Sequence, residues 1–162
     1  MNVLLRQPFR NHLARLLMAA LIVGFAIPAL SPAQTNIDPQ ATGNKYGWST
    51  AGTWINLQGD LTSGVVVTPD YLYGYAWWQG FGWVHFGDGS PENGVHYGND
   101  SATDYGVNND GLGRLSGFAW SESAGWINFE TGGAHVTISP ISGEFAGFAW
   151  CEAGIWIAFT GL

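Results

Sequence analysis

Tryptophans six positions apart recur four times along the chain, and these pairs account for eight of its nine tryptophans. The pairs are Trp48/Trp54, Trp77/Trp83, Trp120/Trp126 and Trp150/Trp156. Flanking residues recur as well, with Gly-Phe-Ala-Trp at 117–120 and 147–150, and Trp-Ile-Asn-Phe at 126–129. Successive pairs begin 29, 43 and 30 residues apart. Self-similarity at such a period is typical of repeat architectures, so we expect four related units.

The first 33 residues have the order of charges and apolar residues that is typical of a secretory signal peptide. Arg6, Arg10 and Arg15 precede an apolar run from 16 to 30, and small residues follow at 31–33. We expect 1–33 to be removed on export, leaving 34–162 as a single domain without a membrane span. The expected location is extracellular or on the cell surface, with the periplasm or an uncleaved membrane anchor as alternatives.

Loss of that segment would leave a strongly acidic chain. Only Lys45 and Arg114 would remain against all twelve acidic residues. A surface of this charge repels phosphate backbones and anionic lipids. Nucleic acid is therefore excluded as a partner.

The composition after residue 33 predicts an all-β fold. Glycine and proline interrupt every stretch, and no window places apolar residues at helical spacing. We expect four antiparallel three-stranded units at about 34–59, 60–89, 90–132 and 133–162, with an insertion near 98–105 in the third. The units would stack or close into a sandwich or barrel, and a small propeller is the alternative.

The spacing of the paired tryptophans indicates a β-hairpin. Five intervening residues would form the loop, so Trp120 and Trp126 would face each other across the two strands. Alternation along each strand then places these rings on one face and Ala119 and Ile127 on the other. Because both faces are apolar, we expect neighbouring units to cover both, with all eight paired indoles packed in a structural core.

The chain resembles a family of exported bacterial repeat proteins. Units of that family carry the signature Gly-Tyr/Phe-Ala-Trp-Ser/Gly-Glu-Asn-x-Gly-Trp-Ile-Asn-Phe, which 117–129 matches except that Ser123 replaces the asparagine. The segments 105–111 and 45–48 resemble the strand that precedes this signature and the first unit of the family. The resemblance implies a secreted or surface-exposed repeat protein, and it brings no catalytic residues.

Aromatic residues outside the repeated positions are the expected ligand contacts, because exposed aromatic faces stack on sugar rings. Trp78 is the foremost candidate, since the equivalent residues of the other hairpins are small or polar. An aromatic side chain folded over the neighbouring unit is the alternative interpretation. The candidates are Trp78, Phe81, Tyr71, Tyr73, Tyr97 and Tyr105.

A calcium site is a further hypothesis, and no other cofactor is expected. Oxygen-bearing side chains lie close together in the sequence at Asp100, Asp104, Asn108 and Asp110, and hard cations are bound by several such oxygens. The turn sequence Asn-Asp-Gly explains part of this group without a metal.

Catalysis is not expected. Glu122 and Glu152 occupy equivalent loop positions, and two nearby carboxylates can cleave glycosidic bonds. Thr50 and Gln79 fill the same position in the other hairpins, which favours solvated loop residues instead. The lone Cys151 is either a serine-sized loop residue or the donor of an intermolecular disulfide.

These features favour a secreted or cell-surface structural or adhesive module. Exposed strand edges would allow it to assemble with itself into oligomers or fibres. The alternative is a lectin-like carbohydrate-binding module, and a glycoside-active enzyme is the third candidate. The expected partners are therefore other copies of this chain or a surface polysaccharide.

Overall fold

A computed structural model describes residues 35–60 and 62–160, and every regular element within these ranges is a β-strand. This confirms the all-β prediction at the level of fold class. Membrane-spanning helices are absent from this described part of the chain. The expected signal peptide at 1–33 lies outside the described residues.

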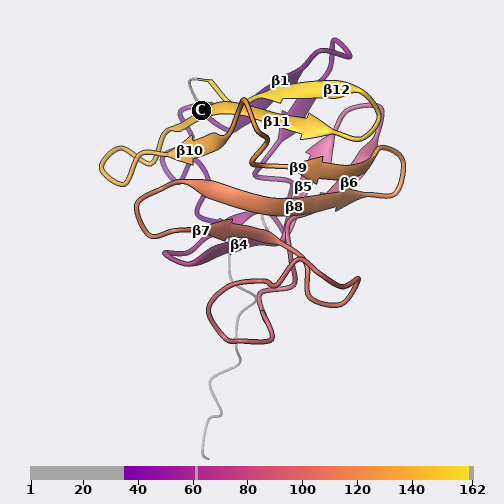
Figure 1. Ribbon diagram of the computed structural model, residues 1–162. Helices are drawn as coiled ribbons and strands as arrows, with labels where there is room; N and C mark the ends of the chain where they lie inside the picture. Colours follow the sequence, from indigo (N-terminus) through magenta and orange to yellow (C-terminus); the bar gives the residue numbers. More distant parts are fainter. Residues whose placement is uncertain (1–34, 61, 161–162) are drawn as a thin grey trace, which may run out of the picture.

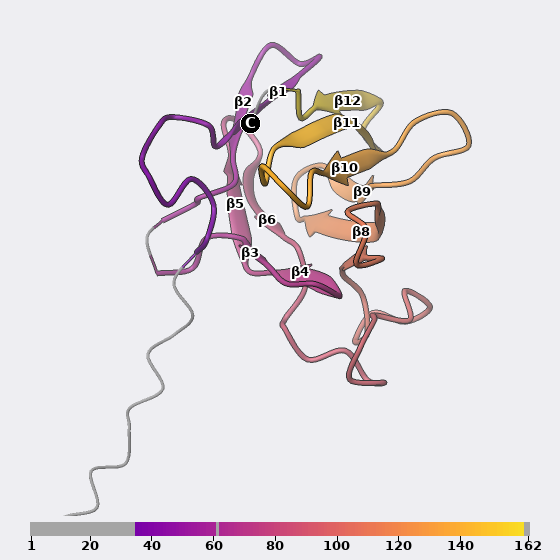
Figure 2. The same ribbon diagram turned by 90° about the vertical axis from the view of Figure 1, so that its left-hand side faces the viewer.

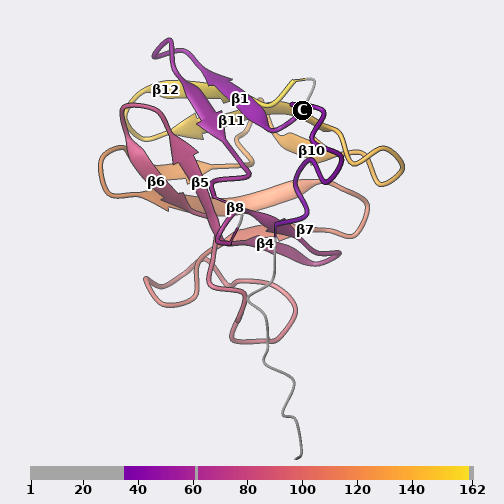
Figure 3. The same ribbon diagram turned by 180° about the vertical axis from the view of Figure 1, so that it is seen from behind.

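Eight strands close into an antiparallel barrel, in which each strand pairs with the next and the last pairs with the first (Figure 1). They are β1 (Tyr46–Ser49), β2 (Trp54–Asn56), β5 (Tyr75–Trp78), β6 (Gly82–His85), β8 (Leu115–Ser121), β9 (Gly125–Asn128), β11 (Phe145–Cys151) and β12 (Ile155–Ala158). These strands form four hairpins, β1/β2, β5/β6, β8/β9 and β11/β12, and each hairpin contains one tryptophan pair. Pairing of Trp48 with Ala158 joins the fourth hairpin to the first, on the side seen in Figure 3.

Four short strands extend the barrel at one end. They are β3 (Val66–Val67), β4 (Tyr71–Tyr73), β7 (Val107–Asn109) and β10 (Val136–Ile138). The first three form a small sheet beside the start of β8, and β10 pairs with the start of β11. Figure 2 shows β3 next to β4, and β10 next to β11. The four three-stranded units that we expected are therefore not confirmed, because the element that recurs is a two-stranded hairpin.

A glycine lies three residues before the first tryptophan of the second, third and fourth pairs, where the chain passes into a barrel strand. Gly74, Gly117 and Gly147 have φ angles of 93°, 84° and 98°, which side chains rarely adopt. A Cβ atom at any of these positions would overlap a carbonyl oxygen of the neighbouring segment. The close backbone approach and the positive φ together explain why glycine recurs here.

Small and branched side chains fill the barrel interior. The first strand of each hairpin directs a small residue inward, and the second directs a branched one. These inward residues are Gly47, Ala76, Ala119 and Ala149 from the first strands, and Ile55, Val84, Ile127 and Ile157 from the second. All are buried, and Leu57, Phe86, Phe129 and Phe159 are buried just beyond the second strands. The interior of an eight-stranded barrel has room for little more than such side chains.

Trp78 is part of this interior, so the prediction that it is an exposed loop residue is wrong. Strand β5 continues one residue beyond Trp77, where Trp78 pairs with Gly82, and alternation therefore directs its ring inward. The ring is fully buried and stacks on Phe81 at 4.2 Å between centroids, and its Nε1 donates a 3.1 Å hydrogen bond to Thr53 Oγ1. The equivalent residues Ser49, Ser121 and Cys151 are small and also buried, so this layer holds one indole.

The eight paired indoles lie on the outside of the barrel. Their expected register is confirmed, since each pair is directly opposed across its hairpin. The prediction that they form a core is wrong: Trp48 is 43% exposed and Trp54 is 50% exposed. Closing a sheet into a barrel covers only its inner face, and the small residues that alternate with the tryptophans occupy that face.

We predict that Gly147→Ala destabilises the protein more than Gly154→Ala does. Both glycines have a positive φ, but only the Cβ at 147 would meet backbone atoms. The conformational cost alone predicts about 1–2 kcal/mol for Gly154→Ala. The added overlap predicts at least about 3 kcal/mol for Gly147→Ala. Urea unfolding measures both, and equal losses would contradict the backbone approach described above.

The neighbours Trp77 and Trp78 provide a second test of the interior. Trp78→Ala removes a fully buried ring and should reduce the free energy of unfolding by about 3–5 kcal/mol. Trp77→Ala removes an exposed ring and one cross-strand contact, so its loss should be about 1 kcal/mol. Thermal unfolding of both variants measures the difference. The reverse order of stabilities would contradict the assignment of the two faces.

Candidate functional site

A band of aromatic side chains covers the outer face of the barrel. Its members occupy the outward positions of the four hairpins and are exposed or half-buried. We call this band the aromatic belt, and it comprises Tyr46, Trp48, Trp54, Tyr75, Trp77, Trp83, Phe118, Trp120, Trp126, Phe148, Trp150 and Trp156. Exposed apolar surface of this extent is typical of a surface that takes part in binding.

The two indoles of each pair meet at a steep angle. Their ring centroids are 4.5 Å, 5.0 Å, 4.7 Å and 4.8 Å apart in the four hairpins, and the ring planes are inclined by 59–75°. At such an angle an indole covers at most one face of its partner. Exposed indole surface remains in the first, second and fourth hairpins, whereas both indoles of the third hairpin are half-buried.

Three grooves separate successive hairpins along the belt. The first groove lies between Trp54 and Trp77, the second contains Trp83 and Trp120, and the third contains Trp126 and Trp150. Their volumes are about 570, 830 and 550 Å³. Volumes of this size are common for sites that bind small molecules.

Polar side chains recur at fixed places in these grooves. One stands two residues after the first tryptophan of a hairpin, and the other stands two residues after the second tryptophan of the preceding hairpin. In the first, second and third groove these pairs are Gln79 with Asn56, Glu122 with His85, and Glu152 with Asn128. Every groove therefore combines indole surfaces with groups that can form hydrogen bonds.

The third groove is lined by aromatic rings and by a segment of a long connection. Tyr105 stands 5.0 Å from Trp126 with its plane inclined by 84°, and Phe118 stands 6.0 Å from Trp126 at 70°. Residues 99–102 of the long connection between β6 and β7 also line the groove. Glu152 Oε2 accepts a 3.2 Å hydrogen bond from the backbone N–H of Trp126, which holds this carboxylate beside the indole.

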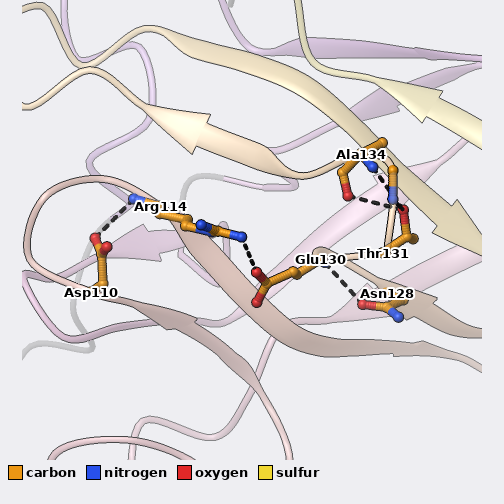
Figure 4. A network of polar contacts seen from close by, with 7 residues as sticks. Asp110, Arg114, Asn128, Glu130, Thr131 and Ala134 are labelled. Carbon is orange, nitrogen blue, oxygen red and sulfur yellow. Dashed lines mark hydrogen bonds and ion pairs between the residues drawn. The ribbon is translucent and has the colours of Figure 1, made fainter.

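A network of polar contacts begins at Asn128, which lines this groove at the end of β9 (Figure 4). Asn128 Oδ1 accepts a 2.9 Å hydrogen bond from the backbone N–H of Glu130, and the Glu130 carboxylate pairs with Arg114. The backbone N–H of Arg114 donates to Asp110 Oδ1 at 2.9 Å. The amide group of Asn128 is therefore held in position, and its Nδ2 has no partner among the described residues.

Tyr105 connects the second groove to the third, because it lines both. Its hydroxyl lies 2.7 Å from Nδ1 of His85, and the imidazole stacks on Tyr75 at 4.7 Å between centroids. Burial lowers the pKa of His85, although the charge of Asp88 opposes the shift, and burial also raises the pKa of Tyr105. Both shifts favour the uncharged form of the group.

The structure places only two of the six aromatic ligand candidates in a groove. Phe81 lines the second groove, and Tyr105 lines two. Trp78 and Tyr97 are buried, while Tyr71 and Tyr73 are half-buried on β4 outside the three grooves. The Tyr97 hydroxyl accepts a 2.7 Å hydrogen bond from the backbone N–H of Gly89, and burial raises the pKa of this hydroxyl.

The structure does not bring the calcium candidates together. The Asp104 carboxylate accepts hydrogen bonds from two backbone N–H groups, and the Asn108 side chain is bonded to the backbone of Tyr97. Asp110 accepts from two backbone N–H groups, and these bonds lower its pKa. Asp100 lines the third groove instead. No group of three or more potential metal ligands is found within 35–60 and 62–160.

The two glutamates that could have formed a catalytic pair line different grooves. Glu122 lines the second groove and Glu152 the third. Neither groove contains both carboxylates, as a two-carboxylate glycosidase site requires.

Cys151 lies inside the barrel at the end of β11 rather than in a loop, and this position disfavours the alternative of an intermolecular disulfide. Alternation along β11 directs its side chain to the axis, where it is fully buried. Its thiol donates a 3.2 Å hydrogen bond to the carbonyl oxygen of Ala124, and burial raises its pKa. A second chain cannot reach this sulfur atom while the barrel is closed.

We predict that the Cys151 thiol is inert in the folded protein. It should fail to react with a thiol reagent such as dithionitrobenzoate under native conditions and react fully in denaturant, because only unfolding exposes it. Absorbance of the released thiolate measures the extent of reaction. A disulfide-linked dimer in non-reducing electrophoresis of native material would contradict this placement.

Comparison of the chain with protein families, curated proteins and solved structures finds no match. The site is therefore interpreted from its own geometry. The polar groove residues Asn56, Gln79 and Asn128 are absent from the candidates that the sequence suggested. The sequence feature that could have identified them is their constant spacing, since each lies two residues after a paired tryptophan. Glu122 and Glu152 have the same spacing.

Proposed function

We propose that this chain is an exported carbohydrate-binding module that holds sugar rings against the aromatic belt. The observation that carries the proposal is the outward placement of the paired indoles beside grooves with recurring polar side chains. A sugar ring has an apolar face of C–H groups and an edge of hydroxyls. An indole matches the face, and amide or carboxylate groups match the edge.

The repetition of the grooves supports a polymer as the ligand. Three grooves of one design lie between successive hairpins of a single barrel. A repeating polysaccharide can occupy several such grooves at once, and linked weak contacts can raise avidity by about 100-fold to 10,000-fold. A surface polysaccharide is thus the partner that best fits repeated sites.

The charge of the described surface limits the class of sugar. Lys45 bonds to Gln58 and Arg114 pairs with Glu130, and neither of these cations lines a groove. Carboxylates line the second and third grooves. Anionic polysaccharides would meet repulsion there, so the proposal is restricted to neutral or cationic sugars.

A self-associating structural or adhesive module is the second candidate. It is supported by the extent of the belt, because exposed aromatic surface on all four hairpins can also pack against a second copy of the chain. Assembly of this kind would be mediated by the indoles rather than by strand edges. The two candidates therefore share a surface and differ in its occupant.

We predict that neutral oligosaccharides bind to the belt. Hexasaccharides of glucose, xylose and N-acetylglucosamine are to be titrated into the protein by calorimetry. The triple variant Trp77→Ala, Trp120→Ala and Trp150→Ala opens all three grooves, and it should weaken binding at least ~100-fold. Ile141→Ala is the matched control, because Ile141 is an exposed apolar residue outside the belt and its removal should leave affinity unchanged.

Absence of binding across these hexasaccharides would contradict the carbohydrate proposal. Light scattering after size-exclusion chromatography then tests the second candidate. A dimer or larger species that the triple variant dissociates would support assembly through the belt, and a monomer at all concentrations would exclude it.

A further inference from the structure

The three grooves share one design but differ in charge. The first groove has the uncharged amides of Gln79 and Asn56, whereas the third has the carboxylate of Glu152 beside the amide of Asn128. The third groove gains a second carboxylate from Asp100. The same molecule therefore has one groove without carboxylates and one groove with two.

Aromatic rings form the other walls of the third groove. The rings of Tyr105 and Phe118 are inclined to that of Trp126 by 84° and 70°, so the walls face different directions. Trp150 lines the groove from the next hairpin. The face of an aromatic ring carries partial negative charge, and it attracts a cation within about 6 Å.

The two carboxylates add to this attraction. The backbone N–H of Trp126 holds Glu152 at the groove, and Asp100 forms no hydrogen bond through its carboxylate with the other described residues. The lining of this groove contains neither lysine nor arginine. Asp100 belongs to the connection between β6 and β7, which occurs in the longest of the intervals between tryptophan pairs.

The geometry points to an amino sugar with a free, protonated amine as the ligand of the third groove. The ammonium group lies among the aromatic walls and faces Asp100 and Glu152, while the sugar ring stacks on an indole. This inference rests on the proposed carbohydrate-binding function and names the class of sugar at one of its sites. The first groove has indoles at the equivalent positions but no carboxylate, and it takes a neutral sugar.

The charge of the ligand can be changed without changing its backbone. Hexamers of glucosamine and of N-acetylglucosamine have the same linkage and differ in whether the nitrogen is protonated. Calorimetric titration at low salt, at a pH where the amine is protonated, should show that the glucosamine hexamer binds at least ~10-fold more tightly. The double variant Asp100→Asn and Glu152→Gln should bring the two dissociation constants within about 2-fold, with affinity for the neutral hexamer unchanged.

Two matched controls separate this site from the general acidity of the protein. Asp70→Asn with Glu144→Gln removes the same charge from exposed positions outside the three grooves, and it should keep the preference for glucosamine. Glu122→Gln makes the equivalent change in the second groove and should also keep it.

The inference is overturned if the unmodified protein binds both hexamers equally. It is also overturned if either control abolishes the preference, or if the double variant retains it. In each of these cases binding of the neutral hexamer leaves the carbohydrate proposal intact. Failure of both hexamers to bind would instead remove the amino-sugar site together with a main support of the carbohydrate proposal.

Discussion

The narrow interior of the closed barrel determines which side chains of its strands lie inside and which lie outside. Each strand directs alternate residues to the axis, and eight strands leave room there for small and branched side chains. Alanine or glycine from one strand of each hairpin lies beside isoleucine or valine from the other. Only one indole, that of Trp78, fits into this interior, and its three counterparts are serine or cysteine.

The position of the aromatic belt follows from this interior. Since the residues between the inward positions must point outward, four hairpins of one sequence pattern place four pairs of indoles around the barrel at regular intervals. The grooves lie where one hairpin meets the next, so their polar residues recur with the same regularity. The buried core and the aromatic belt thereby occupy opposite faces of the same strands. The long connection between β6 and β7 lines the second and third grooves through Tyr105, and its residues 99–102 line the third, while the eight strands of the barrel remain paired.

The sequence was sufficient to predict strands, hairpins and the register of the tryptophan pairs, because each depends on local patterns. The division of residues between two faces was also correct around Trp120 and Trp126. The sequence could not show which face lies inside, since both are apolar and the choice depends on closure by residues more than 100 positions apart, such as Trp48 and Ala158. Trp78 was misplaced for a related reason: its direction depends on how far β5 continues beyond Trp77. Asp104 and Asp110 suggested a cation site because the bonds that their carboxylates accept from backbone N–H groups cannot be seen in a sequence.

Hydroxyl-radical footprinting tests the outward placement of the paired indoles most directly, because mass spectrometry reports the oxidation of each tryptophan separately. The structure predicts rapid oxidation of the five exposed rings, those of Trp48, Trp54, Trp77, Trp83 and Trp156. It predicts that Trp78, which is fully buried, is oxidised at least ~10-fold more slowly than any of them until the protein is unfolded. Protection of the five rings in the folded protein, with rapid oxidation of Trp78, would contradict the account.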